Sequence, residues 1–518
     1  MTLPMISTAS RNCAAAVILL VTSIAAGGCV CAQPAPASVE RYGGEARLGS
    51  EPPFPVHLEV RRTPDRVSGV ISSYGTAFSL EDGQGSDIVT AALGAPGGDP
   101  IVLRFSDGRV EGEFRLGEQE GTLQAMSTAL DAAAYFAEPG QRLDISPAEW
   151  SEDLDRLVEI LVTRHGSPFH RVSEEEFQGA VERIRDDLPG LSGPQAALAL
   201  RRLVAMIGDG HTTLEPARGR PQFPLEAYWF EDGIRLVSIT AEHRDLTGAR
   251  LVAIEDVPVD EVVRRLRAYV PQGESAWSYR FVAPYLFAEP DVLADAGIGC
   301  DEECRFTFET TEGRTRQISL TASSERLRWA TLGGSLPFWL QAPQDGFRTL
   351  PLADGSLYVN WRTYDDLDER ASGLLAELER EQPPRLIVDF RDSGGGDFNL
   401  GRRLIGQLAS LPWLNHPDRL YVLTGRRTFS AAMTNAVDFR IMTNATLVGE
   451  PPGAAPNNWQ EVRFFHLPHS GLRVGVSTLY YEFLPGEDAV HPDIFVPPVP
   501  EDWGNEYDAA VRHILGLA

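Results

Sequence analysis

The chain has 518 residues with 46 basic and 73 acidic side chains, so its formal net charge at neutral pH is -27. Every basic residue is arginine, and no lysine occurs in the sequence. This absence excludes Schiff-base chemistry, a P-loop lysine and a serine–lysine catalytic pair. Arginines scattered among more numerous carboxylates argue against nucleic acid as a partner. At roughly 100–200 residues a domain, the length predicts about three domains.

Residues 1–32 have the layout of a secretory signal peptide. Arg11 precedes an apolar run over residues 14–26, which is too short to span a bilayer comfortably, and small residues follow it. Cleavage after Ala32 would export the chain to the periplasm or the extracellular space. A lipid-modified Cys29 is the alternative, and it would make the protein an outer-membrane-anchored lipoprotein. No later segment is apolar enough over a sufficient length to predict a transmembrane helix.

Two cysteines remain after removal of the signal peptide, Cys300 and Cys304 in GCDEECRF. In an exported chain this pair is expected to form a local disulfide, because a four-ligand zinc site would need two further ligands nearby. His466 and His469, in HLPH, form an isolated pair that is more typical of a solvated turn or strand end than of a metal site. We therefore predict neither a metal nor a cofactor.

The first folded region is predicted over residues 51–140, after a linker over 33–50. Short β-forming runs alternate there with Gly/Asp turns, and the SDG turn between IVLRF and RVEGEF is typical of a β-hairpin. The pattern predicts a small, antiparallel, β-rich N-terminal domain.

A helical segment is predicted over residues 146–215. Ser146 with Glu149 forms a capping box with proline at the first helical position, and the starts SEEE at Ser173 and SGPQ at Ser192 repeat the pattern. The last helix ends at GDGHT, whose glycines place His211 on a tight loop where a side chain is free to face a cleft.

Two further regions follow this loop. Over residues 220–272 the order of strand, turn, strand and amphipathic helix is similar to a degenerate PDZ-like module, without a carboxylate-binding loop of the GLGF type. Residues 273–350 are expected to connect this module to the last domain.

Strands and helices alternate over residues 351–500. The runs LYVNW, LIVDF, LYVLT and ATLVG are short, apolar and rich in β-branched residues, and helical stretches begin at about Asn399 and Ser430. This order predicts an α/β core with a largely parallel sheet and functional residues at the carboxyl ends of its strands. A C-terminal helix is expected over 501–518.

Polar and glycine-rich segments follow two of these strands. LIVDF leads into RDSGGG, where glycines allow backbone N–H groups to turn toward a ligand. LYVLT leads through GRRTF to Ser430, which opens the next helix, so that an oxyanion formed beside it would lie near unsatisfied N–H groups and the positive end of the helix dipole. The alternative is that Ser430 only caps the helix and the glycines only form a turn.

In order and spacing, LIVDFRDSGGGDF, YVLTGRRTFSAAMTNA, ATLVGEPPGAAPN and HPDIFVPP resemble the serine-peptidase family that contains the tail-specific (C-terminal processing) proteases, the tricorn core protease and the modules of interphotoreceptor retinoid-binding protein. The resemblance covers about residues 356–500, and GDGHT adds an upstream block of the tricorn-like branch. It implies an α/β core of the ClpP/crotonase-like type, Ser430 as nucleophile, and the N–H groups of Gly395 and Ala431 as the oxyanion hole.

One departure from the family pattern selects the general base. In the tail-specific branch a lysine serves as the base, and its ungapped counterpart in this sequence is Ala455. The resemblance to the tricorn-like branch implies His211 instead, since histidine titrates near neutral pH and suits proton removal from the serine hydroxyl. The tricorn-like pattern has a serine immediately before the histidine, where this chain has Gly210.

The resemblance also implies a carboxylate that orients the base. GEDAVHPDI offers Glu487, Asp488 and Asp493, and we select Glu487 and then Asp488. His491 is a reserve base, although its neighbouring proline favours a structural loop.

The sequence thus predicts an exported serine-type endopeptidase that acts on polypeptide chains. The first alternative is a catalytically inactive peptide- or lipid-binding protein on the same fold, as the retinoid-binding modules illustrate. A second is an esterase of the α/β-hydrolase type, but the nucleophile elbow G-x-S-x-G is absent around Ser430.

Overall fold

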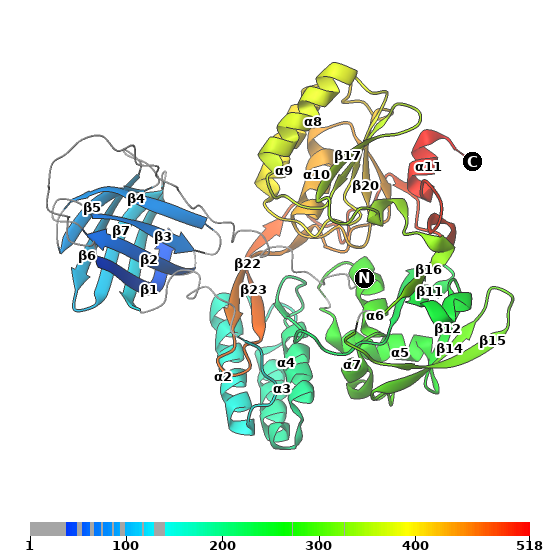
Figure 1. Cartoon of the computed structure of the whole chain (residues 1–518), viewed down its shortest axis with the longest axis horizontal. Helices are drawn as coiled ribbons and strands as arrows, with labels where there is room; N and C mark the ends of the chain where they lie inside the picture. Colours follow the sequence, from blue (N-terminus) through cyan, green and yellow to red (C-terminus); the bar gives the residue numbers. More distant parts are fainter. Residues whose placement is uncertain are drawn as a thin grey trace, which may run out of the picture. The chain divides into compact units, whose positions relative to one another are not determined.

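A computed structural model describes most of the chain, and the described part divides into two compact units, one on each side of residue 139/140 (Figure 1). The predicted signal peptide and Cys29 lie outside the described residues. These are residues 38–48, 54–62, 67–73, 76–84, 87–93, 99–116, 119–128, 140–271, 273–325 and 327–517.

The N-terminal unit is a closed antiparallel barrel of eight strands, so the prediction of a β-rich antiparallel domain is confirmed. The first strand pairs with both the second and the eighth, which leaves no edge strand in the barrel. The strands are β1 (Ser38–Leu48), β2 (Phe54–Arg62), β3 (Val67–Ser73), β4 (Thr76–Gln84), β5 (Ile88–Leu93), β6 (Asp99–Ser106), β7 (Arg109–Leu116) and β8 (Gln119–Ser127).

The predicted linker over 33–50 is wrong for Ser38–Leu48, because these residues form β1. A Cβ atom on Gly44 in this strand would lie 2.0 Å from the carbonyl oxygen of Gln124 on β8. Glycine is therefore needed here for the close approach of two strands.

The predicted SDG hairpin joins β6 to β7, and its prediction is confirmed. Ser106 pairs with Arg109, and the two central residues, Asp107 and Gly108, have φ angles of 46° and 74°. Two positive φ angles are those of a type I′ turn, whose twist matches that of the flanking strands.

The C-terminal unit begins with the helices α2 (Pro147–Arg164), α3 (Glu174–Asp187) and α4 (Gly193–Ala205). The predicted starts are confirmed: the Ser146 and Ser173 hydroxyls accept the N–H groups of Glu149 and Glu176, whose side chains accept the serine N–H groups in return. At the third start, the Gln195 side chain accepts the Ser192 N–H.

A seven-stranded sheet follows, and it extends beyond the PDZ-like range predicted over 220–272. Strands from the predicted connecting segment complete this sheet, so residues 273–350 are not a mere connection. Its elements are β10 (Leu225–Phe230), β11 (Gly233–Thr240), β12 (Arg250–Ile254), β13 (Val257–Pro258), α5 (Val259–Leu266), α6 (Ala276–Leu286), α7 (Pro290–Asp295), β14 (Glu303–Glu309), β15 (Thr315–Thr321) and β16 (Trp329–Thr331).

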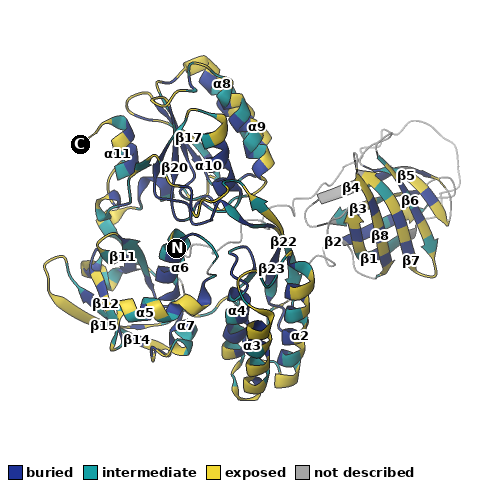
Figure 2. Cartoon of the chain, turned by 180° about the vertical axis from the view of Figure 1, so that it is seen from behind, coloured by how far each residue is buried: buried dark blue, intermediate teal, exposed yellow. Residues whose placement is uncertain are grey.

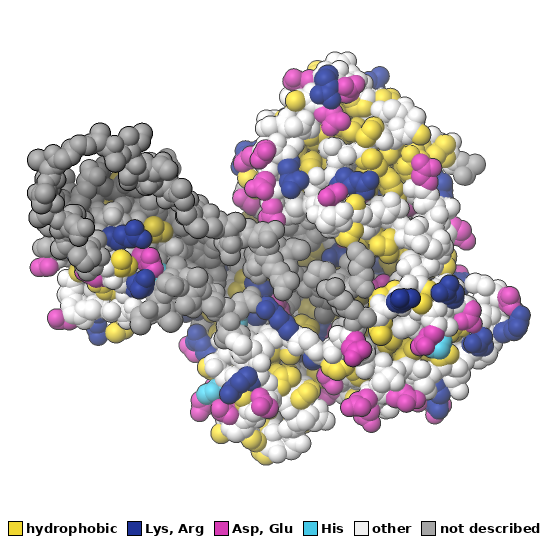
Figure 3. All heavy atoms as spheres, in the orientation of Figure 1, with side chains coloured by type: hydrophobic (Ala, Val, Ile, Leu, Met, Phe, Trp, Pro, Cys, Tyr) yellow, Lys and Arg dark blue, Asp and Glu magenta, His cyan; other side chains and the backbone are white. Residues whose placement is uncertain are grey.

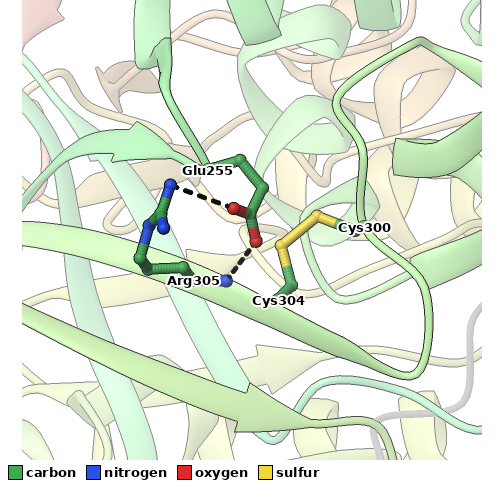
Figure 4. The surroundings of a disulfide bond; sticks show 4 residues. All are labelled: Glu255, Cys300, Cys304 and Arg305. Carbon is green, nitrogen blue, oxygen red and sulfur yellow. Dashed lines mark hydrogen bonds and ion pairs between the residues drawn. A yellow bond between two sulfur atoms is a disulfide. The ribbon is translucent and has the colours of Figure 1, made fainter.

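Cys304 in β14 and Cys300, just before this strand, form a disulfide with their sulfur atoms 2.02 Å apart (Figure 4). Glu255 lies beside the disulfide, and the three side chains together are of types that can bind a metal ion. Its carboxylate accepts the backbone N–H of Arg305 and pairs with the guanidinium of the same residue. Both carboxylate oxygens therefore already have partners.

The α/β core contains a six-stranded sheet in the order β17-β18-β19-β20-β21-β24, in which only β17 runs antiparallel to its neighbour. The predicted largely parallel sheet is thus confirmed. Its elements are β17 (Phe347–Pro351), β18 (Leu357–Trp361), α8 (Leu367–Glu381), β19 (Leu386–Asp389), α9 (Phe398–Ala409), β20 (Leu420–Thr424), α10 (Ala431–Met442), β21 (Thr446–Gly449) and β24 (Ile494–Phe495).

Both faces of this sheet are covered, as its continuous apolar strands require. Alternate residues such as Val359 and Val388 pack with α8, α9 and α10, whereas Tyr358 and Ile387 pack with the C-terminal helix α11 (Ala509–Leu515). Figure 2 shows the resulting contrast between buried strands and the exposed outer side of α8. The predicted C-terminal helix is confirmed with these shorter bounds.

A long hairpin connects the core to the helical segment. It consists of β22 (Asn457–His466) and β23 (Arg473–Glu482), and it extends from the core toward α2–α4 (Figure 1). There β23 pairs with β9 (Thr213–Leu214), directly after the GDGHT loop. Among the helices that the structure describes, none combines the length and the hydropathy that a membrane span needs.

Candidate active site

Ser430 stands at the end of the loop after β20, immediately before α10, and its backbone is strained. Its φ is 52° and its ψ is -130°, a combination that costs an L-residue on the order of 1–3 kcal/mol. The chain continues directly into α10, whose first residue, Ala431, lies at the positive end of the helix dipole. A strained strand-to-helix turn of this kind presents a side chain rather than burying it, and Ser430 is partly exposed.

The hydroxyl of Ser430 does not cap the helix. Ser146 and Ser173, which precede α2 and α3 with extended backbones, both accept a hydrogen bond from the third helical residue. Ser430 makes no such bond to α10. The alternative that Ser430 only caps its helix thus has no hydrogen bond to support it.

Gly395 lies against Ser430, and its conformation requires glycine. Its φ is 102°, and a Cβ atom built on it would lie 2.7 Å from both the Cβ of Ser430 and the amide nitrogen of Ala431. The N–H of Phe429 donates to the carbonyl of Ser393, which fixes the two loops side by side. The backbone of Gly395 and the first N–H of α10 thus come together at the serine side chain.

His211 packs against the residue that precedes Ser430. Its ring centroid lies 4.6 Å from that of Phe429, and the residue as a whole is only 8% exposed. Neither ring nitrogen has a hydrogen-bond partner among the described residues. Burial lowers the pKa of His211 to about 4, an effect that the nearby Asp209 carboxylate only partly offsets, so the ring is neutral at pH 7.

Asp209 holds the His211 loop in shape. One carboxylate oxygen accepts the N–H groups of His211 and Thr212 and the hydroxyl of Ser477 on β23, and the other contacts Nε2 of His165 at 2.9 Å. Burial alone would raise the pKa of Asp209, but the hydrogen bonds from His165 and Thr212 keep it below its ordinary value. The GDGHT block therefore contains its own anionic anchor.

The pairing of β9 with β23 carries this loop to the core. Leu214 pairs with Val474, Thr213 pairs with Gly475, and the N–H of Ser477 donates to the Thr212 hydroxyl. A histidine more than two hundred residues before Ser430 in the sequence thereby reaches the neighbourhood of α10.

Glu274, just before α6, is a site residue that the sequence did not single out. One carboxylate oxygen accepts the N–H of Gly210 at 2.8 Å, and the other accepts the N–H of Ala455 at 2.9 Å. Burial raises the pKa of Glu274 to about 7, against the opposing effect of these two N–H donors. No local pattern distinguishes it from the other acidic residues of the chain.

The predicted orienting carboxylates lie on an exposed loop between β23 and β24. Glu487 and Asp488 are both exposed, and Asp488 lies 3.5 Å from His491 in an exposed ion pair. Because the His211 ring nitrogens have no partner among the described residues, neither carboxylate is hydrogen-bonded to them. Asp493 accepts the N–H of Leu447 on β21, which gives it a structural contact.

Buried arginines surround the carboxyl ends of the strands. Arg391 pairs with Asp389 and with Asp508, and all three side chains are almost fully buried. Arg426 pairs with Glu450 at 2.6 Å and lies over the ring of Tyr228. On the face seen in Figure 3, the arginines of the C-terminal unit are interspersed with acidic side chains.

A pocket of about 340 Å³ adjoins the GDGHT loop, within the size range of ligand sites. It combines backbone of that loop with aromatic side chains of the β22–β23 hairpin. The lining residues are His170, Arg171, Gly208, Asp209, Gly273, Glu274, Asn457, Asn458, Trp459 and Tyr480.

No protein-family model matches the chain, and no curated protein matches its sequence. Among solved structures, mature CPAF is similar with a TM-score of 0.48 at 13% identity, over 71% of this chain and 96% of that one. The photosystem II D1 C-terminal processing protease gives 0.33 at 16%, over 68% and 94%. The tricorn protease gives 0.33 at 12%, over 89% and 45%. No residue role in this chain follows from likenesses of this degree.

Proposed function

We propose that the chain is an exported serine peptidase that hydrolyses peptide bonds through an acyl-enzyme on Ser430, with His211 as the general base. The observation that carries the proposal is the strained, uncapped Ser430 immediately before α10, with Gly395 against it. Beside the preceding residue lies a buried histidine whose ring nitrogens have no hydrogen-bond partner among the described residues. Backbone strain at a residue whose side chain makes no capping hydrogen bond is typical of a functional site.

The proposed reaction has two halves. Ser430 Oγ attacks the scissile carbonyl carbon while His211 takes the hydroxyl proton, and the resulting oxyanion accepts the N–H groups of Gly395 and Ala431. The C–N bond then breaks, and His211 returns the proton to the leaving amine. Water hydrolyses the ester by the same route, which releases the acid and restores Ser430.

For His211 to act as the base, a hydrogen bond between His211 and Ser430 must form when substrate binds. His211 contacts Phe429 but has no hydrogen bond to Ser430 in the described structure. Catalytic hydrogen bonds are often long in ligand-free sites and shorten in the substrate complex. The buried, neutral imidazole has a lone pair available for the serine proton.

The orienting group in this proposal is Asp209, because it binds the loop of His211 directly. We keep Glu487 and Asp488 as proposed orienting carboxylates only for the substrate complex, which would require their exposed loop to move toward the site. A polypeptide is the proposed substrate, and the pocket beside the GDGHT loop is the proposed place for one of its side chains.

A catalytically inactive binding protein on the same fold is the second candidate. The missing hydrogen bond between His211 and Ser430 favours it.

Covalent labelling of the mature protein with a fluorophosphonate, followed by peptide mass spectrometry, distinguishes the two candidates. We expect a single adduct on Ser430, no adduct in Ser430→Ala, and labelling slower by about 10³-fold or more in His211→Ala, the scale of loss when a member of such a site is removed. An unlabelled wild-type protein would favour the binding candidate. Rapid labelling of His211→Ala would exclude His211 as the base.

A further inference from the structure

Glu274 connects the GDGHT loop to the loop after β21. Its two carboxylate oxygens divide their hydrogen bonds, one to the N–H of Gly210 and one to the N–H of Ala455. The next residue, Ser275, is buried and donates its hydroxyl proton to the carbonyls of Pro452 and Gly453 at 2.7 and 2.9 Å. The start of α6 is therefore fixed to both the His211 loop and the loop after β21.

Contacts around Gly210 link Glu274 to the residues of the proposed catalytic pair. A Cβ atom on Gly210 would lie 2.6 Å from Cγ of Glu274 and 2.8 Å from Cζ of Phe429. Glu274 and the aromatic ring that also contacts His211 therefore meet on the same side of Gly210. The same lack of space explains why glycine, rather than serine, precedes the histidine in this chain.

Only the ionised carboxyl group can hold both loops. A carboxylate has two acceptor oxygens and can accept one N–H at each, whereas a protonated carboxyl turns one oxygen into an O–H donor. That donor would face an N–H group, and one of the two loops would lose its partner in a partly buried place.

The charged and titratable groups that face Glu274 come from two neighbouring segments. Asp209 lies on the GDGHT loop, and its charge raises the pKa of Glu274. Arg171 and His170, from the segment before α3, line the same pocket, and Arg171 lowers that pKa. Arg171 has no ion pair among the described residues, so it does not neutralise Glu274 at contact distance.

We propose that Glu274 is a positioning residue of the peptidase site, which keeps His211 aligned with Ser430 only while its carboxylate is ionised. This inference rests on the proposed function. It predicts that peptidase activity falls as pH decreases through about 7, where Glu274 becomes protonated, rather than through about 4, where His211 would.

Stability should have the opposite pH dependence. The folded chain raises the pKa of Glu274 from 4.5 to about 7, so it favours the protonated group. The stabilisation is complete below pH 4.5 and is lost as pH increases through 7. A residue with a merely structural role would lose activity and stability together, whereas Glu274 should gain activity where it loses stability.

The test compares the pH profile of fluorophosphonate labelling at Ser430 in wild type, Glu274→Gln and the matched control Glu176→Gln. Glu176 is an exposed carboxylate in the capping box of α3, where glutamine also serves. In wild type and in the control, we expect the labelling rate to fall as pH decreases through about 7. Glu274→Gln should be labelled about 10²-fold more slowly at pH 8, and the pH at which its labelling rate falls should move toward 4.

Hydrogen exchange, measured by mass spectrometry at pH 8, provides a readout independent of catalysis. Peptides that contain Gly210 and Ala455 should exchange faster in Glu274→Gln than in wild type, and other peptides should not change. The inference would be overturned if the labelling rate of Glu274→Gln still fell near pH 7, or if exchange in both peptides were unchanged. Labelling of the wild type would in that case leave the proposed function intact. An unlabelled wild type would overturn both.

Discussion

At the scale of single residues, the proposed site depends on backbone conformations that only a few side chains tolerate. Ser430 has a φ of 52°, and Gly395 has a φ of 102° with its Cα against the serine. The glycine run and the position of Ser430 before a helix could be predicted from the sequence. The strain at Ser430 could not, because a run such as TFSAAM has no residue that signals a positive φ.

Gly395→Ala should abolish most activity, whereas Gly394→Ala should not. A Cβ on Gly395 would collide with Ser430 and with the N–H of Ala431, which removes a proposed oxyanion donor and costs about 10²–10³-fold in kcat. A Cβ on Gly394 meets no atom within 4 Å. Labelling rates of the two variants measure the difference, and equal rates would contradict the assignment of Gly395 to the oxyanion hole.

At the scale of elements, capping and periodicity could be predicted more easily than long-range pairing. The helix starts at Ser146, Ser173 and Ser192 are local hydrogen-bond patterns, and the sequence displays them. The two residues of β9 are too short for any alternation, and their partner on β23 lies more than 250 residues away. The sequence therefore predicted His211 on a loop but not the strand pairing that carries the loop to α10.

Asp209→Asn should weaken this arrangement. The amide would present an N–H₂ donor to Nε2 of His165, whose Nδ1 already accepts the N–H of Ser167, so two buried donors would face each other. We expect a loss of about 1–3 kcal/mol in the free energy of unfolding at pH 7. Denaturant titration measures it, and Asp155→Asn, which removes an exposed pair with Arg185, should change it by less than about 1 kcal/mol.

The pH dependence of this loss has a definite sign. The pKa of Asp209 lies below its ordinary value of 3.8, so its ionised form stabilises the fold above pH 3.8. That contribution decreases as pH falls through the lowered pKa. The contribution of the Asp209 carboxylate to the difference between wild type and Asp209→Asn should therefore persist at pH 5 and shrink only below pH 3.8. A difference that vanishes by pH 5 would contradict the role of the ionised carboxylate.

At the scale of the whole molecule, the two units have separate cores. The barrel over residues 38–128 has its own buried apolar cluster, and all proposed site residues lie in the unit from Gly140 onward. The sequence predicted this division because its β-only and mixed segments follow each other along the chain. It misplaced the barrel's first strand, because Ser38–Leu48 fell inside the predicted linker.

A chain that begins at Gly140 should fold and react with a fluorophosphonate at Ser430 as the full chain does. Circular dichroism and the labelling rate measure this outcome. A folded but unlabelled chain would show that residues before 140 contribute to the site.

The strand pairing between β9 and β23 also has a consequence for the order of synthesis. His211 and Ser430 leave the ribosome before Val474 and Ser477, the residues that tie the GDGHT loop to the core. Contacts of such long sequence separation form late in folding. Under the proposed function, a nascent chain contains both proposed reacting side chains before the site has formed, so the proposed peptidase would not cleave its own unfolded segments until its last hairpin is in place.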